Sequence, residues 1–289
     1  MLLLSNRLSN KLDENSVRLD VALVDRGLAR SRNQASSFVE SGRVFIDGRE
    51  ARKSSQPVTP NAELVVLEAI DYVSRAGHKL AAALDAFPEI EVVGKICLDV
   101  GASTGGFTDV LLRYGASKII ALDVGHSQLA EPLLDNRLVI NIENFNAREL
   151  SPETLAAVVG KRLDRKLEPS TIELVVADLS FISLTLVLAQ LKAVAPNANF
   201  VLLIKPQFEV GKKSLDASGI VNDHRLRAGA IRQVLDEAKA VGLNIQGLIK
   251  SPLPGTHGNI EFLVWLSAVE TNHSIDWSGR IDELAKERV

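Results

Sequence analysis

The sequence predicts an α/β protein in which helices cover a mostly parallel sheet and a small α+β domain precedes it. From residue 96 onward, short apolar strand segments alternate with helical segments, which is typical of a parallel sheet. The first seventy residues instead predict two short helices followed by a small sheet. The chain has 289 residues, of which 46% are hydrophobic, enough for one or two domains with a sizeable core.

Capping and turn residues justify the elements of the small N-terminal domain. A first helix is predicted to stop at Gly27, and a second to begin at Ser31 and end at Gly42, because serine caps helix starts and glycine ends helices. The pair Asp47-Gly48 after an apolar run predicts a hairpin turn. Residues 63–67 predict a further strand.

Seven strands are predicted in the second region. They lie near residues 96–100, 118–123, 138–142, 173–178, 200–205, 244–250 and 260–267. Helices are predicted near residues 104–113, 126–134, 151–163, 183–194 and 223–241. Only residues 251–259 connect the last two strands, so we expect a terminal antiparallel hairpin. This ending favours a Rossmann-like class I methyltransferase fold, with a seven-stranded sheet, over a six-stranded dinucleotide-binding fold.

The loop after the first of these strands is the strongest sign of a ligand site. Its glycines are Gly101, Gly105 and Gly106, a spacing that differs from the G-x-G-x-x-G of dinucleotide enzymes. Asp123 ends the next strand, where a carboxylate can accept hydrogen bonds from ribose hydroxyls. The alternative is an ordinary strand-to-helix turn in which the glycines serve packing.

The loop and Asp123 together predict a site for S-adenosylmethionine. We expect backbone amides of the loop to meet its carboxylate at a helix N-terminus that Ser103 or Thr104 caps. Asn144 and Asn146 follow the third strand and either lie near the adenine or simply form turns. The candidate cofactor contacts are Asp99, Gly101, Ser103, Thr104, Gly105, Gly106, Phe107, Asp123, Asn144 and Asn146.

Charged residues stand at the ends of apolar strands. Asp178 and Lys205 each follow four apolar residues, and ligands of open parallel sheets lie outside these carboxyl ends. Lys79 in the helix before the first strand and Glu261 at the start of the last strand are expected near the same crevice. Each could instead be a solvated surface charge.

Several segments resemble known families. Lys79, Asp178, Lys205 and Glu261, in this order, resemble the tetrad of FtsJ-type RNA ribose 2′-O-methyltransferases. The segments Ser74–Leu80, Asp99–Asp109, Asp178–Leu184 and Lys205–Glu209 resemble the TlyA (haemolysin A) family. The segments Arg18–Asp20, Gly27–Arg32 and Ser41–Val44 are similar to the RNA-binding domain of ribosomal protein S4.

The resemblance implies an S-adenosylmethionine-dependent enzyme that methylates the ribose 2′-hydroxyl of a cytidine in ribosomal RNA. Lys205 would lie nearest the hydroxyl, Lys79 would perturb it or bind a phosphate, and the two carboxylates would orient the lysines. Ribosomal RNA or ribosomal subunits would be the partners. The candidate RNA contacts are Arg18, Arg30, Ser31, Arg32, Gln34 and Arg43; their alternative is a solvated helical face.

The domains expected from these patterns are a disordered N-terminal extension (1–16), an S4-like RNA-binding domain (17–67), a linker (68–74), an FtsJ-like methyltransferase domain (75–268) and a C-terminal extension (269–289).

Composition and the remaining motifs exclude several classes. A lone cysteine, Cys97, excludes an intramolecular disulfide framework and a cysteine zinc site, and we expect no metal. The apolar run after Met1 is too short for a signal peptide or a spanning helix, so we expect a cytoplasmic protein without a membrane partner, monomeric or weakly dimeric. A membrane-active haemolysin, a nicotinamide-dependent oxidoreductase and an RNA-binding protein with an inactive methyltransferase fold remain alternatives.

Overall fold

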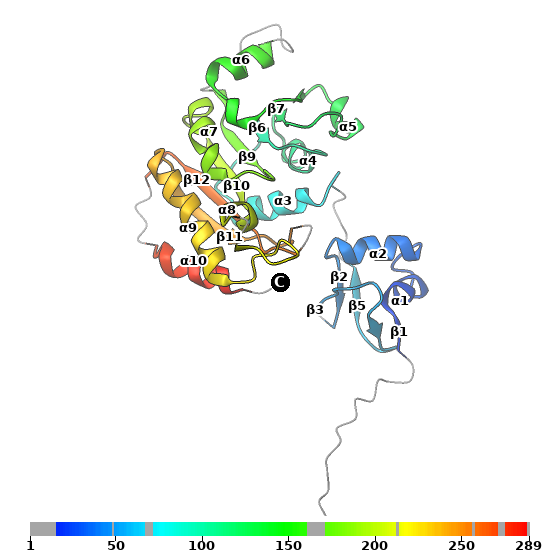
Figure 1. Ribbon diagram of the computed structural model, residues 1–289. Helices are drawn as coiled ribbons and strands as arrows, with labels where there is room; N and C mark the ends of the chain where they lie inside the picture. The colour runs from blue at the N-terminus through cyan, green and yellow to red at the C-terminus, as the bar shows by residue number, and fades with distance from the viewer. Residues whose placement is uncertain are drawn as a thin grey trace, which may run out of the picture. The chain divides into compact units, whose positions relative to one another are not determined.

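The computed structural model describes residues 16–47, 49–66, 72–160, 171–211, 214–255, 258–270 and 275–287 (Figure 1). The chain divides into two compact units, Met1–Ile70 and Asp71–Val289. Most of the expected N-terminal extension, most of the linker and Gly48 of the expected turn lie outside the described residues.

The first unit contains two short helices and two small antiparallel sheets. Its elements are β1 (Val17–Arg18), α1 (Leu19–Asp25), α2 (Arg32–Glu40), β2 (Val44–Ile46), β3 (Arg49–Glu50), β4 (Pro57–Val58) and β5 (Leu64–Val66). Strands β3, β2 and β5 form one sheet, and β1 pairs with β4 in the other. Leu19 and Leu23 of α1 pack with Ala35 and Val39 of α2 in one apolar core. Ser31 caps α2 as predicted, because its hydroxyl accepts from the Gln34 amide.

The second unit is built on one seven-stranded sheet. Its strands are β6 (Ile96–Val100), β7 (Lys118–Leu122), β8 (Val139–Ile142), β9 (Leu174–Ala177), β10 (Asn199–Ile204), β11 (Asn244–Lys250) and β12 (Phe262–Ser267). They lie in the order β11-β12-β10-β9-β6-β7-β8. Strand β12 is antiparallel to both of its neighbours, while the pairs from β10 to β8 are parallel. The predicted mostly parallel sheet with a terminal antiparallel hairpin is therefore confirmed.

Helices cover both faces of this sheet (Figure 1). They are α3 (Ala76–Ala86), α4 (Gly106–Arg113), α5 (Glu131–Leu134), η1 (Ala147–Glu149), α6 (Pro152–Gly160), η3 (Leu184–Leu186), α7 (Leu188–Val194), α8 (Pro206–Glu209), α9 (His224–Ala240) and α10 (Trp277–Lys286). Neighbouring residues of a strand point to opposite faces. Leu98 accordingly packs in the core beneath α6, α7, α9 and α10, whereas Cys97 packs in the core beneath α3 and α4.

Two predicted helices differ from the structure near the glycine loop. The helix expected from residue 104 begins at Gly106, and its N-cap is Gly105, with a φ of 97° and no side-chain cap. The prediction that Ser103 or Thr104 caps this helix is therefore wrong. The helix expected over 126–134 is confined to Glu131–Leu134. Ser127 has a φ of 52°, which is incompatible with a regular helix at this point.

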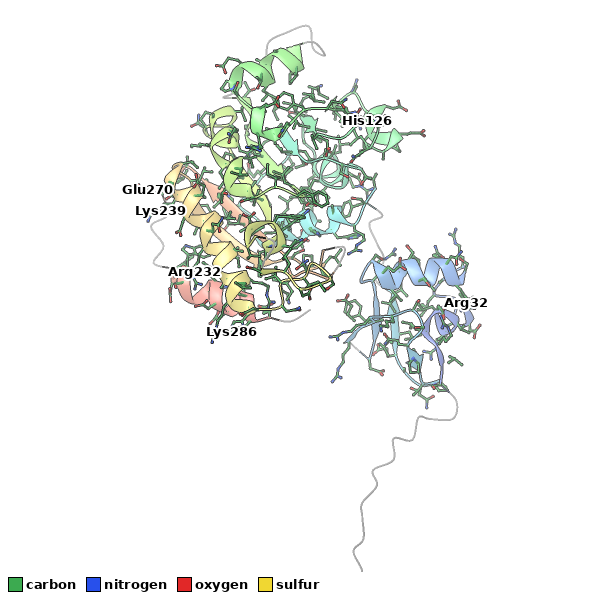
Figure 2. The ribbon with its side chains drawn as sticks, viewed as in Figure 1. Arg32, His126, Arg232, Lys239, Glu270 and Lys286 are labelled. Carbon is green, nitrogen blue, oxygen red and sulfur yellow. The ribbon has the colours of Figure 1, made fainter. Side chains whose placement is uncertain are left out.

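Helix α10 lies in the segment for which the sequence offered no motif. Ile281, Leu284 and Ala285 belong to the same core as α9. The guanidinium of Arg232 on α9 donates to Asp282 on α10 at 2.7 Å; Arg232 is labelled in Figure 2. Residues 277–286 thus pack as part of the second unit.

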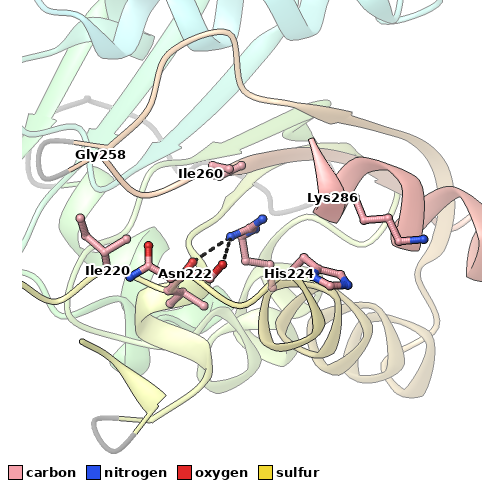
Figure 3. A pocket seen from close by; sticks show the side chains of 8 residues that line it. Ile220, Asn222, His224, Gly258, Ile260 and Lys286 are labelled. Atoms are coloured by element: carbon pink, nitrogen blue, oxygen red, sulfur yellow. Dashed lines mark hydrogen bonds between the residues drawn. The ribbon is translucent and has the colours of Figure 1, made fainter. Parts of the chain in front are cut away.

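A buried arginine fastens α10 at its C-terminal end. Arg227 donates to the Ala285 carbonyl at 3.0 and 2.7 Å and to the carbonyls of Val221 and Asn222 at 2.9 and 3.0 Å. Arg227 lines a cavity of about 610 Å³. Asn222, His224 and Lys286 of the same lining are labelled in Figure 3. Because all three guanidinium nitrogens bind backbone carbonyls, we assign Arg227 a structural role.

Candidate active site

A cavity of about 450 Å³ opens at the carboxyl edge of the sheet. The four charged residues expected at one crevice, Lys79, Asp178, Lys205 and Glu261, all line it. Strand register explains how β10 and β12 bring two of them together. Ile204 pairs with Phe262, so the residues just beyond this pair, Lys205 and Glu261, lie side by side at the edge.

Lys205 pairs with Asp178 at the end of β9. Its Nζ lies 2.6 Å from Asp178 Oδ1, and it donates to Ser180 Oγ at 2.8 Å. The two charged side chains are 11% and 16% exposed. An ammonium and a carboxylate this far removed from water are stable only as a pair.

Lys79 pairs with Glu261 in a more deeply buried contact. Lys79 Nζ lies 2.6 Å from Glu261 Oε2, and the side chains are 9% and 2% exposed. Gln207 on α8 donates to the other carboxylate oxygen, Oε1, at 3.1 Å. Both oxygens of Glu261 therefore have a donor, which a buried carboxylate requires. Gln207 follows Lys205 by two residues, but the sequence alone carried no signal that it reaches Glu261.

The glycine loop forms the adjoining wall of the cavity. Gly101, Ser103, Thr104 and Phe107 line it. The loop is held by Asp123, whose carboxylate accepts from the amides of Ser103 at 2.8 Å and Gly125 at 2.7 Å. Helix α4 has no side-chain cap, and the backbone of Thr108 in its first turn hydrogen-bonds to the buried Asp99.

The three glycines of the loop serve different needs. Gly101 has a φ of 85°, and a Cβ there would lie 2.8 Å from the carbonyl oxygen of Asp178. Side chains on Gly105 and Gly106 would collide with Leu133 and with Ser74, respectively. Only Gly101 of the three lines the cavity, so Gly105 and Gly106 permit close packing beneath the loop.

Four other candidate cofactor residues, Asp123 among them, are not part of the cavity lining. Asp99 is completely buried and accepts from Thr108 Oγ1 at 2.6 Å. Burial raises the pKa of Asp99 to about 7. Asn146 caps η1, as its side chain accepts from the Arg148 amide. Asn144 has a φ of 56°, typical of a turn residue. Both asparagines thus have a local role in turn or cap geometry.

The sequence did not predict an exposed aromatic side chain near the carboxyl edge of the sheet. Phe181 is 92% exposed and has a φ of 65°, a strained conformation for a bulky residue. Its ring centroid lies 5.3 Å from that of Phe208 on α8. Phe181 directly follows Ser180, which contacts Lys205. Strain beside a cavity is a common feature of functional sites.

The candidate RNA-binding residues of the first unit divide into two groups. Arg18 and Arg32 both contact the buried Asp20 at 2.9 Å, while their own side chains remain 49% and 59% exposed. The hydrogen bond from Arg18 holds the pKa of Asp20 well below its usual range. Arg43 stacks over the Phe38 ring, with 4.2 Å from its guanidinium carbon to the ring centroid, and Arg30 is exposed.

Ser31 and Gln34 have local structural partners. Ser31 caps α2, and the Gln34 side chain accepts from the Arg30 amide at 2.7 Å.

Among the described residues, no cluster of three or more histidine, cysteine, aspartate or glutamate side chains could hold a metal. Nor is any described helix long and apolar enough to cross a membrane.

The strand order, the glycine loop and the charged carboxyl edge define the second unit as a Rossmann-like class I methyltransferase domain. An FtsJ-like methyltransferase family model matches residues 72–268, and an S4 domain model matches residues 17–64. The chain is 45% identical to the 16S/23S rRNA (cytidine-2′-O)-methyltransferase TlyA of Mycobacterium tuberculosis strain H37Rv, over 92% of this chain and 94% of the relative.

Further relatives agree with this match. Hemolysin A of Brachyspira hyodysenteriae is 38% identical, over 86% of this chain and 98% of the relative. A solved structure from Streptococcus thermophilus, titled as a hemolysin, is 34% identical with a TM-score of 0.66 and covers 94% of each chain. The chain belongs to the TlyA family, which joins an S4 domain to an FtsJ-like methyltransferase domain.

Proposed function

We propose that the protein methylates the ribose 2′-hydroxyl of a cytidine in ribosomal RNA, with S-adenosylmethionine as methyl donor. The observation that carries this proposal is the meeting of two lysine–carboxylate pairs in the cavity that the glycine loop also lines. The TlyA relatives from M. tuberculosis and Campylobacter jejuni are named as rRNA (cytidine-2′-O)-methyltransferases, which supports the choice of acceptor.

Lys205 is the proposed proton acceptor. A ribose hydroxyl is weakly acidic, so its oxygen attacks well only if a base removes the proton. A lysine amine can do this in its neutral form. Lys205 is largely buried, and Lys79 lines the same cavity. Asp178 holds the amine of Lys205 at this edge by charge attraction.

Lys79 has the complementary role in this proposal. Its amine is held against Glu261, and Gln207 fixes the other oxygen of that carboxylate. An ammonium fixed in this way can attract the phosphate next to the acceptor ribose. This task does not require Lys79 to exchange a proton.

The loop residues fit S-adenosylmethionine. We assign its carboxylate to the first turn of α4 and its ribose hydroxyls to Asp123, whose carboxylate also holds the Ser103 amide. The donor supplies a methyl group on a positively charged sulfur, so that an O–C bond forms as the C–S bond breaks and the sulfur leaves neutral. Val124, which is 70% exposed next to Asp123, offers an apolar surface to the adenine.

Two further features suit an RNA acceptor. Single-stranded nucleotides are commonly recognised by stacking on exposed aromatic rings, and Phe181 presents such a ring. The exposed arginines of the first unit are proposed to bind RNA phosphates. We place the reaction in the cytoplasm because ribosomal subunits are found there.

Labelled S-adenosylmethionine and ribosomal subunits that lack the modification test the function. We expect label in ribosomal RNA at one cytidine ribose, found by mapping the modified nucleotide. Lys205→Ala should abolish the transfer while donor binding persists. The matched control is Lys239→Ala, since Lys239 is an exposed lysine on α9, labelled in Figure 2, and should behave as wild type. RNA binding without any transfer by the wild-type protein would favour the inactive-fold alternative.

A further inference from the structure

We propose that Ser180 is a positioning residue for Lys205: its hydroxyl fixes the rotation of the lysine amine so that one tetrahedral position of Nζ faces the cavity. The inference rests on the proposed function, because it assigns the group that aims the proton acceptor. Ser180 belongs to neither of the two lysine–carboxylate pairs, but it lines the same cavity as both.

The two oxygens around Lys205 act differently. Asp178 Oδ1 lies 2.6 Å from Nζ, yet this buried oxygen has no aligned hydrogen-bond partner among the described residues. The carboxylate therefore attracts the amine without setting the direction of an N–H bond. The 2.8 Å contact with Ser180 Oγ does meet hydrogen-bond geometry. Ser180 supplies the directional contact.

The arrangement serves the amine in both protonation states. A lysine Nζ is tetrahedral, and the chain carbon and Ser180 account for two of its four directions. Because the hydrogen bond to Ser180 fixes rotation about the Cε–Nζ bond, the other two directions are fixed as well, and we assign one of them to the cavity that Lys205 lines. In the neutral amine this direction carries the lone pair that accepts the ribose proton. After proton transfer it carries the new N–H bond, while the contact with Ser180 persists.

The backbone around Ser180 is held by the short helix that begins next to Lys205. Glu209 of α8 is buried, and its carboxylate accepts from the Ser183 hydroxyl and, at 3.0 Å, from the Leu184 amide. Phe208 of the same helix stacks with Phe181. Helix α8 thus fixes the segment from Phe181 to Leu184. It also fixes Lys205, which is the N-cap of this helix. The Ser180 hydroxyl and the Lys205 amine are therefore positioned by the same helix.

Three variants test this role in full-length protein, with ribosomal subunits and labelled donor. Ser180→Ala removes the hydroxyl and should lower kcat about tenfold, because a poorly aimed base slows the reaction without weakening binding. KM for the subunit and the affinity for S-adenosylmethionine should not change. Ser180→Thr keeps a hydroxyl at an exposed position and should restore most of kcat. Ser117→Ala is the matched control, since Ser117 is exposed and donates to the Lys95 carbonyl, away from the cavity lining.

Each outcome decides the matter. A wild-type kcat in Ser180→Ala would overturn the proposal. So would a threonine variant as slow as the alanine variant, or a loss of donor affinity that parallels the loss of kcat, because both point to a general structural defect. Absence of transfer by the wild-type protein would overturn the proposed function, and the role of Ser180 with it.

Discussion

At the scale of single residues, the site depends on pairs of side chains that are distant in the sequence. Lys79 and Glu261 are separated by 182 positions and lie 2.6 Å apart. The position of Asp178 and Lys205 at this edge was predictable, because a charge that follows an apolar strand points to the ligand-binding end of a sheet. Lys79 and Glu261 do not follow strands, and for them the resemblance to the FtsJ-type tetrad supported the same edge. The sequence did not predict which lysine pairs with which carboxylate, because this pairing depends on strand register and side-chain direction.

Phe181 provides a prediction at this scale. Phe181→Ala should lower kcat/KM for RNA by about tenfold, because base–aromatic stacking contributes roughly 1–3 kcal/mol per base. The melting temperature should hardly change, because the side chain is exposed. Steady-state methylation assays check the first expectation and thermal unfolding checks the second.

Phe181→Trp keeps an aromatic face and should remain active. Val93→Ala is a suitable control, since Val93 is also an exposed apolar residue, at 79%, and does not line the cavity. Equal kcat/KM in wild type and Phe181→Ala would rule out stacking as the role of Phe181.

At the scale of secondary-structure elements, the turn between β6 and α4 decides whether a donor site can form. The sequence indicated the turn through its glycines. It did not reveal that Gly105 is the N-cap of the helix, or that Gly101 lies close to the end of β9, because those contacts depend on neighbouring segments of the fold.

Gly101→Ala tests this element. A Cβ would lie 2.8 Å from the carbonyl oxygen of Asp178, and the φ of 85° is unfavourable for alanine. We expect the free energy of unfolding to fall by about 1–3 kcal/mol, together with weaker binding of S-adenosylmethionine. Thermal unfolding and calorimetric titration measure the two effects.

Gly229→Ala is the matched control for this change. Gly229 lies inside α9, and nothing stands within 4 Å of a Cβ placed there. Alanine should stabilise that helix by up to about 1 kcal/mol. If Gly101→Ala were as stable as wild type and bound the donor equally well, the loop would not be the close-packed turn described above.

At the scale of the whole molecule, the two units carry different parts of the proposed reaction. The second unit holds the residues for chemistry, and the exposed arginines of the first unit are proposed to hold RNA. The salt dependence of binding separates the two contributions, because each neutralised phosphate steepens the dependence of affinity on salt.

Arg30→Ala combined with Arg32→Ala should weaken RNA binding and leave the affinity for S-adenosylmethionine unchanged. Loss of two phosphate contacts should make the log–log salt dependence shallower by about 1.5. Alanine is preferable to glutamate, because a carboxylate at position 32 would face the buried Asp20. Filter binding at several salt concentrations measures the change, with Lys239→Ala as control. An unaltered slope would contradict a phosphate-binding role.

The sequence by itself determined the order of helices and strands, the glycine loop and the identity of the four charged residues. These features are local, because hydrophobic periodicity, capping residues and strand ends each depend on only a few neighbouring residues. The main local error, the cap of α4, arose where the positive φ of Gly105 replaced a side-chain cap.

The tertiary structure decided the rest. It brought Ser180, Gln207 and Phe208 to the carboxyl edge of the sheet. It also packed α10 against α9 through Ile281 and through the hydrogen bonds from Arg227 to the Ala285 carbonyl. The contacts at the sheet edge could not be predicted from hydrophobic periodicity, because they depend on which strands are neighbours and in which register they pair. The residues for the proposed chemistry could therefore be identified from the sequence, but the side chains that contact them could be identified only from the assembled sheet.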